Sequence, residues 1–246
     1  QTFSEQRQFF TEGIDLFNKG NLFFSRRIGG PPSTEPTLGE NEEVVGTPEK
    51  VKVLNAVKVS GRTKKGLGLG VFNSITERVD VTIRDVLTNE TRMQVIEPFT
   101  NYNILVSDQQ FNGNSSIGII NTNVFRTGSF RDANVTGLIS NISNKRNTYN
   151  IRAQVKMSNV NEQTGNEMGL SSFVFVRKAH GKFRYSFDHS YADKKYDIND
   201  LGLQFRNNFN NFGVDASYRI FEPTEKWNRY SIGTYVNYTR LADPST

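Results

Sequence analysis

The feature that most constrains this chain is a strict alternation of apolar and polar residues in its second half. Residues 149–157, YNIRAQVKM, place apolar side chains at every odd position and polar side chains between them. Residues 183–191 and 212–220 repeat the pattern with many aromatic residues on the apolar side. On a helix these apolar side chains would wind around every side, whereas on a strand they form one face. The alternation therefore predicts β-strands with one apolar and one polar face.

Less regular alternation predicts further strands in the first half, which are expected at residues 51–60, 66–77, 99–110, 115–127 and 132–142. We expect about ten to twelve strands after residue 48, joined by short connections in an antiparallel, up-and-down order. The turn-rich clusters between the later strands lie further apart than the ~8 to 12 residues that are typical of a soluble β-sandwich. A tilted membrane-spanning strand needs ~9 to 11 residues, which fits this spacing better.

The faces of these strands agree with a membrane barrel, because outer-membrane barrels turn apolar residues to lipid and polar residues to the lumen. Aromatic residues also lie at predicted strand ends, as in an interfacial girdle: Phe183, Tyr191, Phe212, Tyr230 and Tyr238. The polar residues expected to line the lumen are Arg152, Lys156, Arg184, Asp188, Gln204, Arg206, Asp215 and Arg219. The alternative is a soluble antiparallel sheet with one wet face, which gives the same alternation.

The predicted fold class is thus all-β, an antiparallel up-and-down transmembrane β-barrel with an irregular N-terminal segment. We divide the chain into that segment and its linker at 1–48 and the barrel strands at 49–246. The last residues, LADPST, contain proline and no terminal aromatic residue, although a complete bacterial barrel is expected to end on a strand. We therefore expect an incomplete portion of a larger barrel.

The segment at residues 7–32, RQFFTEGIDLFNKGNLFFSRRIGGPP, is rich in phenylalanine and reads neither as a clean helix nor as a strand. It could enter the lumen as a plug, or it could lie outside as a strap that docks another domain. The residues expected at plug contacts are Glu12, Asp15, Arg26, Arg27, Gly66, Gly68 and Gly70, with the two arginines paired to luminal carboxylates. Residues 33–50 are acidic and contain proline, which indicates a loop-like linker.

The glycines of GLGLG, at residues 66–70, resemble part of a phosphate-binding loop. The dinucleotide fingerprint requires a third glycine where Val71 stands, and no helical pattern follows. On a strand the three glycines share one face, and a strip without side chains lets another backbone approach closely. We interpret them as a contact surface and predict no nucleotide.

Catalytic groups are few. The chain has no cysteine, which excludes disulfides and thiolate metal sites. Asp188, His189 and Ser190 are neighbours, but a strand points them alternately to opposite faces, so they cannot form a triad. The acidic stretch DKKYDIND, at 193–200, lacks the glycine and ligand spacing of a calcium loop and indicates a solvated turn. We predict no catalytic residue, no metal, no cofactor and no enzyme activity.

The charges do not indicate a nucleic-acid partner, because 30 Lys and Arg and 25 Asp and Glu are interleaved along the chain. No apolar run approaches the ~18 to 20 residues of a transmembrane helix. No export signal stands at the start. The expected partners are outer-membrane lipid, other envelope proteins and glycans.

Several blocks carry a resemblance to a known family: RQFFTEGIDLFN and LFFSRRIGGPP, LNAVKVSGRTKKGLGLGVFNSITE, NYNILVSDQQFNGNSSIGIINTNVFR, and DANVTGLISNISNKRNTY. Across about residues 7–150 the chain resembles Bacteroidota outer-membrane proteins in which a family-9-like carbohydrate-binding module precedes a long barrel-like domain of unassigned function. The resemblance implies an exported protein of the Gram-negative cell envelope. From the predicted barrel we expect an outer-membrane pore, transporter or envelope scaffold. The resemblance implies no reaction, and the sugar-binding module is absent here. The alternative function is a soluble all-β carbohydrate-binding protein.

Overall fold

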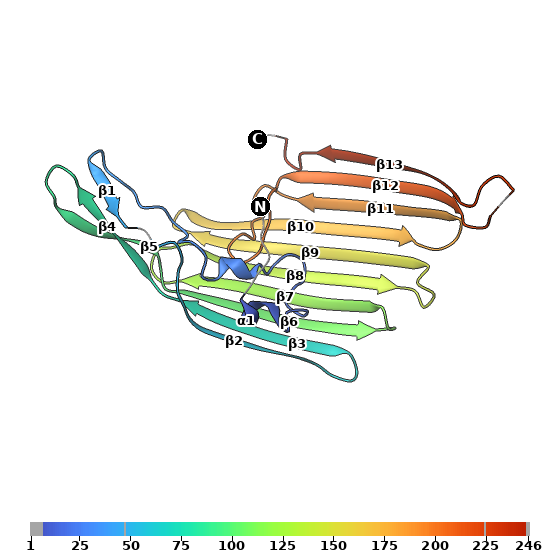
Figure 1. Ribbon diagram of the computed structural model, residues 1–246, viewed down its shortest axis with the longest axis horizontal. Coiled ribbons are helices and arrows are strands. Elements are labelled where there is room, and N and C mark those ends of the chain that lie inside the picture. The colour runs from blue at the N-terminus through green and yellow to red at the C-terminus, as the bar shows by residue number, and fades with distance from the viewer. Residues whose placement is uncertain (1–6, 47, 224, 245–246) are drawn as a thin grey trace.

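The computed structural model describes residues 7–46, 48–223 and 225–244 as an all-β protein with almost no helix (Figure 1). Residues 1–6 and 47 of the predicted N-terminal segment therefore lie outside the described residues, as do residue 224 and the last two. The larger sheet has ten strands, β2 Val53–Arg62, β3 Leu67–Thr76, β6 Thr100–Phe111, β7 Ser115–Arg126, β8 Asp132–Ser143, β9 Tyr149–Glu162, β10 Gly165–Lys178, β11 Phe183–Ala192, β12 Phe209–Ile220 and β13 Tyr230–Arg240. The smaller sheet has three strands, β1 Glu42–Val45, β4 Val79–Asp85 and β5 Thr91–Glu97.

The predicted strands are confirmed with small shifts at their ends, and the described residues contain twelve strands after residue 48. The smaller sheet was not predicted. In the sequence, its hairpin of β4 and β5 is inserted between β3 and β6, which are neighbours in the larger sheet. Its third strand, β1, lies inside the stretch at 33–50 that was interpreted as a loop-like linker. That sheet has a small core of its own, formed by buried Val51, Val79, Val81, Ile83 and Ile96.

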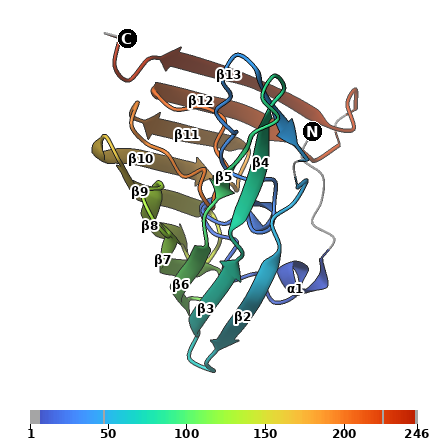
Figure 2. The same ribbon diagram turned by 90° about the vertical axis from the view of Figure 1, so that its left-hand side faces the viewer.

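The ten-stranded sheet is an antiparallel meander, in the order β2-β3-β6-β7-β8-β9-β10-β11-β12-β13. The up-and-down order is therefore confirmed, apart from the excursion into the smaller sheet. No closed barrel is found among the described residues, because β2 and β13 are the two edges of the sheet. The sheet is curved instead, and Figure 2 shows the N-terminal segment inside the curve.

One face of this sheet, which we call the bare face, is apolar across many strands. A row of paired residues crosses six strands in register, and its members are Ile142, Ile151, Val176, Phe187, Val214 and Val236. No other part of the described chain covers this row: Val214 is 50% exposed and Val236 is 62% exposed. A folded protein exposes contiguous apolar surface on this scale where it binds something apolar.

The opposite face, which we call the covered face, carries the main core. A second row of paired residues runs from Gly70 through Val106, Ile120 and Gly137 to Lys156. The side chains of this face pack against residues of the N-terminal segment and of the β11–β12 loop. None of the described helices, α1 Gln8–Thr11 and a short 3-10 turn at Ser25–Arg27, is long and apolar enough to cross a membrane.

Candidate functional site

The N-terminal segment, residues 7–32, packs on the covered face around one phenylalanine of β3. Phe72 is 1% exposed, and its ring centroid lies 6.1 Å from that of Phe10 and 6.3 Å from that of Phe17. Aromatic pairs at such distances add to the free energy gained by burying apolar area. Leu22 and Ile28 continue the buried stripe along the segment. The phenylalanine-rich stretch thus supplies the side chains of a core, without forming a regular element.

The N-terminal segment packs directly against two of the three glycines that were predicted to contact it, Gly68 and Gly70. A Cβ atom at Gly68 would lie 2.8 Å from Cδ2 of Leu16, and one at Gly70 would lie 2.9 Å from Cζ of Phe17. Both distances are too short for a carbon contact, so the segment can approach only because these residues lack side chains. Gly66 differs, since it lies in the turn before β3 with φ +87° and its Cβ would meet the carbonyl oxygen of Gln110.

Charged side chains anchor the same segment. Asp108 of β6 is buried and accepts from Lys19 Nζ at 2.8 Å and from Arg62 Nη2 at 2.6 Å. Lys156 Nζ of β9 donates to the carbonyl oxygen of Gly20 at 3.0 Å. A buried carboxylate with two cationic partners is expensive to leave unpaired, so these bonds fix the segment's position on the sheet.

The contacts of Arg27 and Glu12 differ from expectation. Arg27 donates to the carbonyl oxygen of Gly202 at 3.3 Å and to the side-chain oxygen of Asn199 at 3.2 Å, so its predicted carboxylate partner is wrong. Glu12 accepts from Gln8 within the segment, and its carbonyl oxygen accepts from Lys58. The side chains of Asp15 and Arg26 are exposed.

The β11–β12 loop, residues 193–208, also packs on the covered face, which the sequence did not predict. Its Tyr196, Ile198 and Leu201 are buried in the main core, so the prediction of a solvated turn is wrong. The loop lies so close to β10 that a Cβ atom on Gly169 would stand 2.3 Å from the Cα atom of Tyr196. The loop also pairs with the N-terminal segment, because the N–H of Phe24 donates to the carbonyl oxygen of Leu201 at 2.7 Å.

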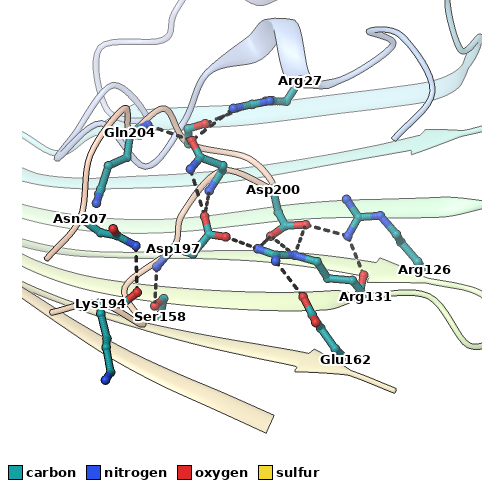
Figure 3. A network of polar contacts seen from close by, with 12 residues as sticks. Arg27, Arg126, Arg131, Ser158, Glu162, Lys194, Asp197, Asp200, Gln204 and Asn207 are labelled. Atoms are coloured by element: carbon teal, nitrogen blue, oxygen red, sulfur yellow. Dashed lines mark hydrogen bonds and ion pairs between the residues drawn. The ribbon is translucent and has the colours of Figure 1, made fainter. Parts of the chain in front are cut away.

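Ion pairs hold this loop to the strand ends, and Figure 3 shows how they converge. Arg126 Nη1 donates to Asp200 at 2.8 Å, and Arg131 Nη2 donates to Asp200 at 2.7 Å and to Asp197 at 2.6 Å. Glu162 of β9 adds a fourth pair, 3.0 Å from Arg131. The side chains of Arg126 and Asp200 are 8% and 6% exposed, so this pair is almost fully removed from water.

The docking of this loop depends on pH through Asp197. Burial alone would raise the pKa of Asp197, but the N–H of Asn199 and the guanidinium of Arg131 lower it below its ordinary value. Because the folded pKa is depressed, the carboxylate stabilises the docked loop above about pH 4, and this contribution is lost as the pH falls through the folded value. We therefore expect acid to release the loop before the sheet.

Hydrogen exchange in residues 193–208, corrected for intrinsic rates, measures this release between pH 7 and pH 3. Asp197→Asn should weaken the docked loop at pH 7 and flatten its pH dependence. An unchanged pH dependence in that variant would show that another group controls the loop.

The residues that were expected to line a lumen divide into two groups. Six of them belong to strands and share the covered face by register: Arg152, Lys156, Arg184, Asp188, Asp215 and Arg219. The other two, Gln204 and Arg206, lie in the β11–β12 loop rather than on a strand. The loop brings these two back to Arg152 and Lys156, and all four line one cavity of about 760 Å³.

These features define a class: an antiparallel β protein with one bare apolar face and a second face, with both core and charged residues, that its own chain covers. The chain belongs to the family described as a domain of unknown function (DUF5916), which matches residues 1–246. No curated protein and no solved structure matches the chain. The narrower relation to Bacteroidota outer-membrane proteins stays a prediction.

Proposed function

We propose that the ten-stranded sheet is the wall of an outer-membrane β-barrel whose polar interior is closed by a plug, and that the protein acts in transport across that membrane. The observation that carries the proposal is the contrast between the two faces. The bare face is apolar and exposed in register over β8 to β13, while the covered face of β9 and β11 holds charged residues, among them Arg152, Lys156 and Asp188. Membrane barrels divide apolar and polar residues between their faces in this way.

Strand length supports the same proposal. The strands from β6 to β13 have 10 to 14 residues, and ~9 to 11 residues suffice to cross the hydrocarbon region when tilted. In lipid every backbone N–H and C=O group needs an internal partner, which an open sheet edge lacks. We therefore propose that β2 and β13 pair with further strands to complete the wall.

Two segments lie over the covered face, the N-terminal segment and the β11–β12 loop, and they favour a gated transporter over an open pore. The N-terminal segment is fixed by Asp108 and Lys156, and the β11–β12 loop is fixed by Arg126 and Arg131. Both lie on the face that would enclose the lumen, as plugs do in larger barrels. The resemblance to Gram-negative envelope proteins supports the outer membrane as the location and its lipid as the partner.

Single cysteines test the proposal directly, because the chain has none of its own. In reconstituted vesicles, a fluorophore on Leu138→Cys, on the bare face, should be quenched by lipids brominated on their acyl chains. The matched variant Asn141→Cys lies on the same strand, β8, and pairs with Arg152 of the covered face. Its fluorophore should escape that quenching.

Equal quenching at the two positions, or a protein that stays monodisperse without any amphiphile, would contradict the membrane proposal. The second result would favour a soluble carbohydrate-binding protein instead.

A further inference from the structure

The cavity of about 760 Å³ on the covered face is assembled from three parts of the chain that are distant in sequence. The N-terminal segment contributes Asn18 and Asn21, β9 contributes Arg152 and Lys156, and the β11–β12 loop contributes Gln204 and Arg206. Its volume lies within the ~300 to 1,000 Å³ of sites that bind small molecules. It is separate from the ion-pair cluster around Asp200.

The charge of this cavity is one-sided. Three cationic side chains line it, and no carboxylate does. Among the described residues, none of the three forms an ion pair: Lys156 bonds to a carbonyl oxygen, and the two arginines lie over rings. The guanidinium of Arg152 is 4.3 Å from the ring centroid of Phe175, and that of Arg206 is 5.7 Å from that of Phe209.

Asp188, an acidic residue on the same face, forms no ion pair with these cations among the described residues. Asp188 of β11 stands opposite Phe175 and packs against Gly213, where an added Cβ would lie 2.4 Å from its Oδ1. With three cations and no carboxylate in its lining, the cavity favours an anionic ligand.

The remaining lining groups suit a ring that carries hydroxyl groups. Phe173 and Phe205 offer apolar faces, and Phe205 is 85% exposed although it borders the cavity. Side-chain amides both donate and accept, so Asn18, Asn21 and Gln204 can bond to hydroxyl groups in either sense. Arginine pairs with a carboxylate through two parallel hydrogen bonds.

We propose that this cavity binds an acidic saccharide, with the acid group held by Arg152 and Arg206 and a sugar ring packed on Phe173 and Phe205. An acidic saccharide would then be the solute that the plugged barrel transports, and this role in transport rests on the proposed function. Binding itself requires only the covered face and the two segments that lie over it.

Titration calorimetry with digalacturonate, in a detergent without a sugar headgroup, tests the proposal. The wild-type protein should bind digalacturonate at least tenfold more tightly than the dimethyl ester of the same disaccharide, because the ester lacks the charge. Replacing both cavity arginines, Arg152→Gln with Arg206→Gln, should weaken binding of the acid at least tenfold, since each loses a charged hydrogen bond.

Arg177→Gln is the matched control. This residue lies on the same face, on β10, and also contacts the ring of Phe175, but it does not line the cavity. Its affinity should match the wild type. No measurable binding of digalacturonate, equal binding of the ester, or equal weakening by Arg177→Gln would overturn the proposal.

The ester comparison uses wild-type protein, so it decides the matter even if the double variant does not fold. The cysteine labelling at Leu138 reports on the membrane independently. A failure of the membrane proposal and a failure of saccharide binding therefore remain distinguishable.

Discussion

Asp200→Ala should lower the free energy of unfolding by about 3–5 kcal/mol, the cost of leaving a buried ion without its partner. Asp200 is the carboxylate shared by Arg126 and Arg131, and the side chain of Arg126 is 8% exposed. Arg126 also has an Nε atom that is buried without a hydrogen-bond partner among the described residues. Loss of Asp200 would leave most of that guanidinium uncompensated. Urea denaturation followed by circular dichroism measures the effect.

Asp80→Ala is the matched control, because Asp80 is only half-buried and forms an ion pair of similar length with an exposed arginine. Its Oδ1 lies 2.7 Å from Arg78 Nη2, and the arginine side chain is 59% exposed. Exposed pairs contribute about 0–1 kcal/mol, so this variant should remain close to the wild type. Similar losses in the two variants would mean that burial does not control the cluster.

A double change separates the ion pair from the packing around it. With Asp200→Leu and Arg126→Met together, no buried charge is left unpaired, and such replacements are often neutral or stabilising. The double variant should therefore recover most of the stability that Asp200→Ala loses. If it does not, the loop depends on the geometry of the ion pairs themselves.

The strands and their two faces could be predicted because a period of two is a local property of the sequence. Tyr149 to Met157 show it without interruption, and the register confirms that Arg152 and Lys156 share a face with Gly70. The glycine contacts could be predicted for the same reason, since Gly68 and Gly70 alternate with leucine and valine.

The β11–β12 loop could not be predicted in this way, because its burial depends on residues far along the chain. DKKYDINDLG has the composition of a solvated turn. It is buried because Gly169 leaves room for Tyr196 and because Arg126 and Arg131 form ion pairs with Asp197 and Asp200. The one local sign was the apolar series Tyr196, Ile198 and Leu201 among the charges. Likewise, alternation predicts strands without specifying what pairs with the edges of the sheet.

Val155→Arg and Phe187→Arg should each cost about 2–4 kcal/mol in a bilayer if these residues lie near its midplane, because a charged side chain would replace an apolar one facing lipid. Both residues lie on the bare face, where they are 50% and 41% exposed. In a soluble protein an arginine at such an exposed position would change stability by less than about 0.5 kcal/mol. The two environments therefore predict different results for the same substitution.

Gln154→Arg is the control, since it is adjacent to Val155 and lies on the covered face beside the cavity. It should cost much less, because water reaches a luminal side chain. Equilibrium unfolding in lipid vesicles, read by the shift in gel migration between folded and unfolded protein, compares the three variants. Equal tolerance of arginine at Val155 and Gln154 would show that the bare face does not meet lipid, and a protein partner would then be the better explanation of its exposed apolar row.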